Sequence, residues 1–322
     1  MDFRKLGQTE LKVSRLALDT WNFGGLVDEA DALRLIDRCL ELGINYYDTS
    51  NVFGEGLAEE VLGRALRGRR EHVVLATKVG FKASQDDAPL SRAAIGRAIE
   101  SSLRRLGTDY LDLYYLQQPD PKTPVDETMS AVDKLVAEGK IRHAGVSNFA
   151  SWQVVRLLWS SSQRGYPTIS VSQPLYSIVV RDIEQDYLSC CKEFGIAVVA
   201  YNPFAGGLLS KTSLPMARRP KRIAGDGLYL DGYAHPSLLA AVEKLSLIAE
   251  QAGISLDSLA LRWLLSRSIV DSVLLSASSL HELETYISAC QETSLPSDVL
   301  EACEQVHRGL DDPTLRQEAL GA

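Results

Sequence analysis

The sequence is short of cysteine and histidine, and the few present are not arranged to bind a metal. Five cysteines and five histidines occur among 322 residues. The cysteines are Cys39, Cys190, Cys191, Cys290 and Cys303, and the histidines are His72, His143, His235, His281 and His307. Neither set shows the short, repeated ligand spacing of a zinc site. We therefore expect no metal, reduced thiols of a cytoplasmic protein, and structural roles for the histidines.

Long hydrophobic runs and an excess of positive charge are also missing. No apolar stretch reaches the roughly 20 residues that a membrane-spanning helix needs, and the residues after Met1 do not begin a signal peptide. The formal net charge of −8 disfavours nucleic acid and anionic membranes as partners. We expect a cytoplasmic protein that acts on a small-molecule substrate and binds neither nucleic acid nor a membrane. The sequence does not distinguish a monomer from a homo-oligomer.

A Gly-x-Gly-x-x-Gly motif at the start of a helix is absent, which argues against a doubly wound dinucleotide-binding sheet. The sequence instead alternates between strand-like and helix-like runs. Strands are expected at residues 15–18, 44–47, 73–77, 111–116, 142–146, 169–172, 196–200 and 273–275. Helices are expected at residues 28–42, 57–66, 91–106, 125–138, 151–161 and 183–194, with a helical pair at 236–266. Strands that are each followed by a helix in this way predict an α/β fold, the (β/α)8 TIM barrel.

Several local signals complete this prediction. Two short strands around Gly7 predict an amino-terminal β-hairpin before the barrel. Ser91 is expected to cap a helix and Gly107 to end it. The long irregular stretch 202–235 follows the seventh strand and is a candidate lid. No Pro/Ser-rich linker interrupts the pattern, and a hydrophobic fraction of 45% suffices for one large core, so we expect a single domain over residues 1–322.

Polar residues close three of the expected strands. Asp48, Lys78 and Gln117 each come directly after a β-rich run, and a glycine-containing loop follows Asp48. Ligands of parallel α/β folds meet the carboxyl ends of the strands. We therefore expect an acid, a lysine and an amide to line one polar site.

Five segments, in order and at matching spacing, resemble signatures of the aldo-keto reductase family. They are Gly43–Thr49 (Gly-Ile-Asn-Tyr-Tyr-Asp-Thr), Ala76–Gly80, Leu106–Leu113, Glu138–Lys140 and Gly145–Phe149. The resemblance extends over nearly the whole chain. It implies a (β/α)8 barrel that binds NADP(H) without a Rossmann unit and transfers a hydride to a carbonyl group.

The resemblance also implies an active-site tetrad of Asp, Tyr, Lys and His, of which two members are present. Asp48 and Lys78 match, whereas Phe53 stands at the tyrosine position and Gln117 at the histidine position. In the family the tyrosine hydroxyl gives its proton to the carbonyl oxygen, and neither phenylalanine nor glutamine is an acid near neutral pH. Asp19 stands where the family usually has glycine, so it is a candidate acid. These five residues are the candidate catalytic residues.

Four of the five also have a purely structural interpretation. The Asp48–Lys78 pair has a less favoured interpretation as a buried ion pair retained in a fold that lost its chemistry, because its disruption would cost stability. Phe53 is explained as a core side chain, and Asp19 as a solvated residue at the end of a strand.

The nicotinamide side of the family's cofactor site is well matched. Ser147, Asn148 and Gln173 stand at the positions that hold the carboxamide, and Tyr201 at that of the aromatic that stacks on the nicotinamide ring. The further candidate cofactor-binding residues are Thr20, Trp21, Asp48, Pro203, Gly207 and Ser276. Trp21 also matches an aromatic of the substrate pocket.

The adenine side departs from the family pattern. Ser278 and Ser279 at a helix start can donate to phosphate, but Glu282 replaces a glutamine there and would repel it. No arginine in this segment is available to bind a 2′-phosphate in bidentate fashion. We therefore expect NADP(H) with weakened selectivity, and NAD(H) as the alternative cofactor.

Three classes of function are compatible with these residues. The first is an NAD(P)H-dependent oxidoreductase with a non-standard active site, which reduces a C=O, C=N or activated C=C bond. The second is a redox-neutral lyase, dehydratase or isomerase that uses Lys78 with Asp48 or Asp19. The third is a non-catalytic subunit or cofactor sensor. The nicotinamide-side residues and the Asp48–Lys78 pair favour the first class, with slow reduction of ordinary carbonyls because the general acid is missing.

Overall fold

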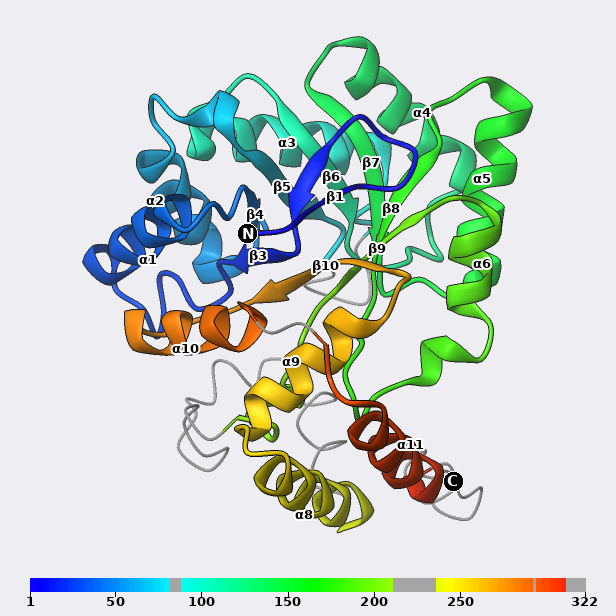
Figure 1. The fold of residues 1–322 in the computed structure, drawn as a ribbon. Coiled ribbons are helices and arrows are strands. Elements are labelled where there is room, and N and C mark those ends of the chain that lie inside the picture. The colour runs from blue at the N-terminus through cyan, green and yellow to red at the C-terminus, as the bar shows by residue number, and fades with distance from the viewer. Residues whose placement is uncertain (82–87, 211–235, 292–293, 311–322) are drawn as a thin grey trace. The chain divides into compact units, whose positions relative to one another are not determined.

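The barrel strands lie where the sequence predicts them, with each end within three residues of its predicted position. The computed structural model describes residues 1–81, 88–210, 236–291 and 294–310. The strands are β3 (Leu16–Asp19), β4 (Tyr46–Asp48), β5 (Val74–Val79), β6 (Leu111–Leu116), β7 (Ile141–Ser147), β8 (Ile169–Gln173), β9 (Ala197–Ala200) and β10 (Val270–Leu275). They form a closed barrel in the order β10-β3-β4-β5-β6-β7-β8-β9, and the strands paired along this order run parallel. The (β/α)8 barrel is confirmed (Figure 1).

Helices cover the outer face of the barrel strands in the first part of the chain (Figure 1). They are α1 (Glu29–Glu41), α2 (Leu57–Ala65), α3 (Arg92–Leu106), α4 (Val125–Ala137), α5 (Ser151–Arg164) and α6 (Tyr187–Glu193). Because both faces of the strands are covered, their side chains are almost all buried, as in β6, where all six residues are buried. The predicted ends of α3 are confirmed, since the Ser91 side chain accepts a hydrogen bond from the backbone N of Ala94 and Gly107 adopts a φ of 63°.

One expectation for the helices was wrong in detail. The helix expected at 183–194 is shorter, because Asp186 has a non-helical φ of −144° and a 3₁₀ turn (Asp182–Glu184) precedes α6. The helical pair at 236–266 is confirmed as α8 (Pro236–Gln251) and α9 (Leu256–Ser266). Two more helices, α10 (Leu280–Gln291) and α11 (Ser297–Leu310), follow without a predicted range.

The amino-terminal hairpin is also confirmed. Strands β1 (Phe3–Lys5) and β2 (Lys12–Ser14) pair antiparallel, with Phe3 opposite Ser14. The stretch expected as a candidate lid is described only as far as Ser210, and residues 211–235 lie outside the described part of the chain.

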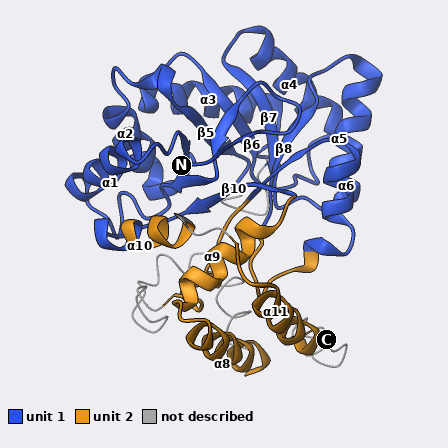
Figure 2. Cartoon of the chain, in the orientation of Figure 1, with its two compact units in different colours: residues 1–174, 183–199, 269–283 blue, residues 175–182, 200–268, 284–322 orange. Residues whose placement is uncertain are grey.

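The chain divides into two compact units that alternate along the sequence (Figure 2). The first contains residues 1–174, 183–199 and 269–283, and the second contains residues 175–182, 200–268 and 284–322. In the second unit Trp263 is fully buried, with its ring 5.4 Å from that of Tyr176 and the Arg267 guanidinium 4.1 Å above it. A single domain over residues 1–322 stays a prediction.

Two sequence expectations concern membranes and metals. Within the described ranges, no helix has the length and apolar character needed to cross a membrane. In the same ranges, no group of three or more His, Cys, Asp or Glu side chains could hold a metal ion.

Candidate active site

Asp48 and Lys78 form a buried ion pair at the carboxyl ends of neighbouring strands. The side chains are 0% and 3% exposed, and Lys78 Nζ contacts the Asp48 carboxylate directly. Lys78 also donates to the carbonyl oxygen of Thr49 at 2.9 Å, and Gln173 Nε2 donates to Asp48 Oδ1 at 3.0 Å. The carboxylate therefore has a charged and a neutral donor, which a buried charge needs in order to remain ionised.

Phe53 occupies the space beside this lysine. Its ring centroid lies 4.9 Å from Lys78 Nζ, and the ring of Trp21 meets it edge-on at 4.9 Å. Phe53 begins a 3₁₀ turn in which Gly54 has a φ of 55°, and a Cβ on Gly54 would lie 2.8 Å from the carbonyl oxygen of Phe23. This tight approach fixes the loop, so the aromatic ring faces the ammonium group with no hydroxyl to donate a proton.

Two buried tyrosines lie in the barrel near Asp48 and were not singled out from the sequence. The hydroxyls of Tyr46 and Tyr115 are 2.8 Å apart, and both side chains are fully buried. Burial raises the pKa of both phenols, and the nearby Asp48 charge raises each further. Burial therefore works against proton release from either phenol. A signal was present in the sequence, since each stands two residues before a site residue and so faces the same side of its strand.

Gln117 belongs to the same group of strand ends. Its Oε1 accepts a hydrogen bond from the Ser50 hydroxyl at 2.9 Å, and its carbonyl oxygen accepts one from Asn148 Nδ2 at 3.0 Å. The Ser147 hydroxyl donates to the carbonyl oxygen of Gln173 at 2.8 Å. Hydrogen bonds therefore link the ends of β6, β7 and β8, and the predicted residues Gln117, Ser147, Asn148 and Gln173 lie together.

Asp19 lies next to Asp48 in the barrel. The two residues are register partners on β3 and β4. Asp19 Oδ1 accepts a hydrogen bond from the backbone N of Trp21 at 2.6 Å, and the side chain of Ser276, which follows β10, also hydrogen-bonds its carboxylate. Asp19 is thus held by hydrogen bonds among the candidate site residues, although the residue is partly exposed.

The carboxyl groups of Asp19 and Asp48 both interact electrostatically with the single cation Lys78. Burial raises the pKa of Asp48 to about 6, an effect that Lys78 opposes and Asp19 reinforces. Burial also raises the pKa of Asp19, again against the influence of Lys78. Both acids are therefore harder to ionise than they would be in the unfolded chain, and the second carboxylate lowers the stability of the folded protein at neutral pH.

This effect can be measured with Asp19→Asn. Because the folded-state pKa of Asp19 is raised, its destabilising contribution is absent below the unfolded-state pKa of about 3.9 and is complete once the pH exceeds the folded-state pKa. We expect the variant to be more stable than the wild type at pH 8, by about 1 kcal/mol, and equally stable at about pH 3, below the unfolded-state pKa. Urea unfolding at both pH values checks this. A variant that is less stable than the wild type at pH 8 contradicts the assignment.

The start of α10 holds the residues predicted for the adenine side. Glu282 Oε2 accepts hydrogen bonds from both the backbone N and the hydroxyl of Ser278, each at 2.7 Å. Ser279 Oγ accepts from the backbone N of Glu282 at 3.2 Å, so these residues cap the helix among themselves. The Glu282 carboxylate thus accepts hydrogen bonds from two Ser278 donors that the sequence analysis assigned to a phosphate.

Three of the predicted residues belong to the second unit and are described with it. Tyr201 follows β9 and forms an isolated bridge with Leu175, and Pro203 and Gly207 come after it. Gly207 lies in a short 3₁₀ turn (Ala205–Gly207) and has a φ of 92°.

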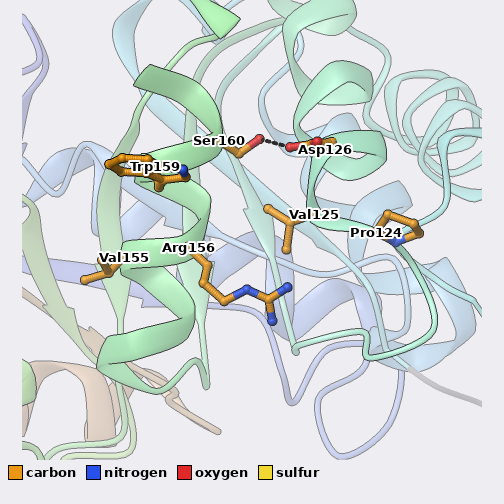
Figure 3. Close-up of a pocket in the computed structure, with 7 residues that line it drawn as sticks. All are labelled: Pro124, Val125, Asp126, Val155, Arg156, Trp159 and Ser160. Carbon is orange, nitrogen blue, oxygen red and sulfur yellow. Dashed lines mark hydrogen bonds between the residues drawn. The ribbon is translucent and has the colours of Figure 1, made fainter. Parts of the chain in front are cut away.

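A groove of about 470 Å³ lies elsewhere on the barrel, between α4 and α5 (Figure 3). It is lined by Pro124, Val125, Asp126, Val155, Arg156, Trp159 and Ser160. The Ser160 hydroxyl donates to Asp126 at 2.7 Å across it. None of the predicted site residues lines this groove, so it is separate from the cluster around Asp48.

Comparison with known proteins gives one consistent picture. The family model described as Aldo/keto reductase family matches residues 15–308. The uncharacterised oxidoreductase YrpG of Bacillus subtilis (strain 168) is 34% identical over 328 residues, covering 96% of this chain and 97% of the relative. A probable voltage-gated potassium channel subunit beta of Arabidopsis thaliana is 30% identical, with 95% and 96% covered. Aflatoxin B1 aldehyde reductase member 2 of Rattus norvegicus is 32% identical, with 89% and 83% covered.

Proposed function

The chain belongs to the aldo-keto reductase family and is an NAD(P)H-dependent oxidoreductase, and we propose that it reduces a small organic substrate at a non-standard active site. The reacting bond is C=O, C=N or an activated C=C. The observation that carries the proposal is the Asp48–Lys78 ion pair, which is intact and buried while a phenyl ring takes the place of the phenol beside it.

The residues of the nicotinamide side suit the cofactor. Thr20 lies between Asp19 and Trp21, and its hydroxyl is buried with no hydrogen-bond partner in the described part of the chain. Asn148 has a φ of 60°, a conformation that non-glycine residues seldom adopt and that is common at functional sites. We assign Thr20, Ser147, Asn148 and Gln173 to cofactor binding, with the hydride supplied by the cofactor when bound.

The remaining side chains hold the substrate more readily than they protonate it. Lys78 is engaged by Asp48 and by the carbonyl oxygen of Thr49. Gln117 is a neutral hydrogen-bonding group whose Oε1 is already used by Ser50. General acid catalysis is worth about 10²–10⁴-fold where it operates, so unactivated ketones are poor substrates at this site.

The same contacts argue against a redox-neutral lyase or isomerase. A lysine base needs its amino group free to reach the substrate, whereas Lys78 Nζ is engaged by the Asp48 carboxylate and the Thr49 carbonyl oxygen. Turnover by enzyme dialysed free of cofactor, with no response to added NADPH or NADH, would nevertheless establish that alternative. If Lys78→Met left the biological activity unchanged, a non-catalytic role such as a channel subunit would be supported.

Cofactor binding is the direct test of the proposed function. Titration of the protein with NADPH and with NADH should quench its tryptophan fluorescence in a saturable manner. Asn148→Ala should weaken the binding of both cofactors, because it removes a donor assigned to the carboxamide. If neither cofactor bound at millimolar concentration, the proposed function would be wrong.

Glu282 should decide between the two cofactors. Its carboxylate accepts the hydrogen bonds of Ser278 and would repel the 2′-phosphate of NADPH. We therefore propose that the protein binds NADH as well as NADPH. Glu282→Gln removes the charge and keeps the shape, and should tighten NADPH binding by about tenfold while changing NADH binding little. Equal changes for the two cofactors in the fluorescence titration would contradict this role.

A further inference from the structure

The cluster at the strand ends contains one more acid than base. Asp48 and Lys78 neutralise each other in a direct ion pair. Asp19 stands beside them as the register partner of Asp48, and its hydrogen-bond partners are the uncharged Trp21 backbone N and Ser276 side chain. Within the described residues Asp19 forms no ion pair of its own. With all three groups ionised, the cluster therefore carries one uncompensated negative charge.

Neutral aromatic surface lies at the same place. The residue Trp21 is 37% exposed, and Phe53 packs against its ring edge-on at a centroid distance of 4.9 Å. Because Trp21 directly donates its backbone N–H to the Asp19 carboxylate, the indole and the carboxylate are held on one short loop. A carboxylate together with exposed indole surface is a combination that binds organic cations.

From these observations we propose that the substrate is an iminium ion, a cationic carbon–nitrogen double bond, with the Asp19 carboxylate as its counter-ion. The inference rests on the proposed reductive function and names the substrate class for it. Asp19 is then a substrate-binding residue that contacts the reacting group.

The chemistry of this reduction needs no acid. The hydride from NAD(P)H brings two electrons to the iminium carbon and forms the new C–H bond. The π electrons of the C=N bond become the lone pair on nitrogen, which loses its positive charge, and NAD(P)⁺ is the oxidised product. A carbonyl treated in the same way becomes an alkoxide that must take up a proton.

The three unusual residues are consistent with this single change of substrate. Phe53 removes a proton donor that an iminium does not use. Gln117 places a neutral group where a protonated imidazole would repel a cation. Asp19 adds the anion that a cation needs, although its burial raises its pKa and lowers stability in the absence of substrate.

The test uses two probes of the same shape. 3,4-Dihydroisoquinoline is a cyclic imine that is protonated to an iminium, and 1-tetralone is a bicyclic ketone of matching size. With NADPH or NADH, the wild type should reduce the imine and leave the ketone nearly untouched. Asp19→Asn should lower kcat/KM for the imine by about 10–10²-fold, as expected for the loss of a charged hydrogen-bonding partner. Asp19→Glu should recover part of the activity.

Inhibition provides a second readout, which compares a charged ligand with an uncharged ligand of the same shape. Protonated 1,2,3,4-tetrahydroisoquinoline should inhibit the wild type more strongly than isochroman, its uncharged oxygen analogue. Asp19→Asn should remove the difference while retaining cofactor binding. Retained fluorescence titration with NADPH or NADH shows that the variant is folded.

Each result has a definite reading. The inference is overturned if the imine is not reduced by cofactor-bound enzyme, if Asp19→Asn reduces it as well as the wild type, or if isochroman inhibits equally. Reduction of tetralone that disappears in Asp19→Asn would identify Asp19 as a proton donor, and would also overturn it. All of these leave the proposed reductive function standing, whereas the absence of any cofactor binding removes that function itself.

Discussion

Replacing Phe53 by tyrosine together with Gln117 by histidine is expected to raise kcat/KM for a simple aldehyde by about 10²–10⁴-fold. The Phe53 ring lies 4.9 Å from Lys78 Nζ, so a hydroxyl on that ring would reach the vicinity of the ammonium group. The positive charge would lower the pKa of the new phenol and favour proton transfer to the substrate oxygen. The histidine would orient the carbonyl, as the family resemblance implies.

A matched control separates the acid from the change of shape. Phe53→Leu with Gln117→His alters the packing around Lys78 but supplies no hydroxyl, and should show no gain with 4-nitrobenzaldehyde. Lys78→Met added to the active double variant should remove most of the gain. If the wild type already reduces the aldehyde as fast as the Tyr/His variant, the two replacements do not explain the chemistry of this protein.

The grouping of the candidate site residues at the strand ends could be predicted from the sequence because the barrel strands impose it. Asp48, Lys78 and Gln117 each end a β-rich run, and parallel strands bring such ends together. Period-two alternation then fixes which residues face inward. The closed barrel and the amino-terminal hairpin were predicted correctly for the same reason, since local pattern and topology agree.

The environment of Asp19 could not be predicted in this way. Sequence comparison indicates only a carboxylate where the family usually has glycine. Its partner Ser276 comes from the far end of the chain, and its neighbour Asp48 is set by the register of β3 and β4. The pKa shifts depend on such contacts between distant segments and on burial, neither of which local pattern specifies.

The contacts of Glu282 at the start of α10 also could not be predicted from the sequence. The residue types suggested that a carboxylate would oppose phosphate binding, and this stays a prediction. Whether the carboxylate faces solvent or caps its own helix depends on side-chain geometry, and here it accepts two hydrogen bonds from Ser278. The buried Tyr46–Tyr115 pair likewise depends on space, since a Cβ on Gly145 would lie 2.5 Å from the Tyr115 ring.

The other large effect is expected for Lys78→Met, which should lower the free energy of unfolding at pH 8 by about 3–5 kcal/mol. The variant leaves the Asp48 carboxylate fully buried with Gln173 as its hydrogen-bond donor and with Asp19 beside it. Burial already raises the pKa of Asp48 to about 6 with the lysine present. Removing the cation raises that pKa further, and the unpaired charge then becomes the main cost of folding.

The pH dependence distinguishes this cause from a simple packing defect. A raised carboxyl pKa in the folded state favours folding at low pH and disfavours it as the pH rises through that pKa. The stability deficit of Lys78→Met should therefore shrink from pH 8 to pH 5 in urea unfolding. The control Asp48→Leu/Lys78→Met removes both charges, and should recover most of the stability at pH 8 because apolar replacement of a buried pair is often neutral. A deficit of equal size at both pH values, unrelieved in the double variant, would mean that the pair is held by packing and that its charges do not matter to folding.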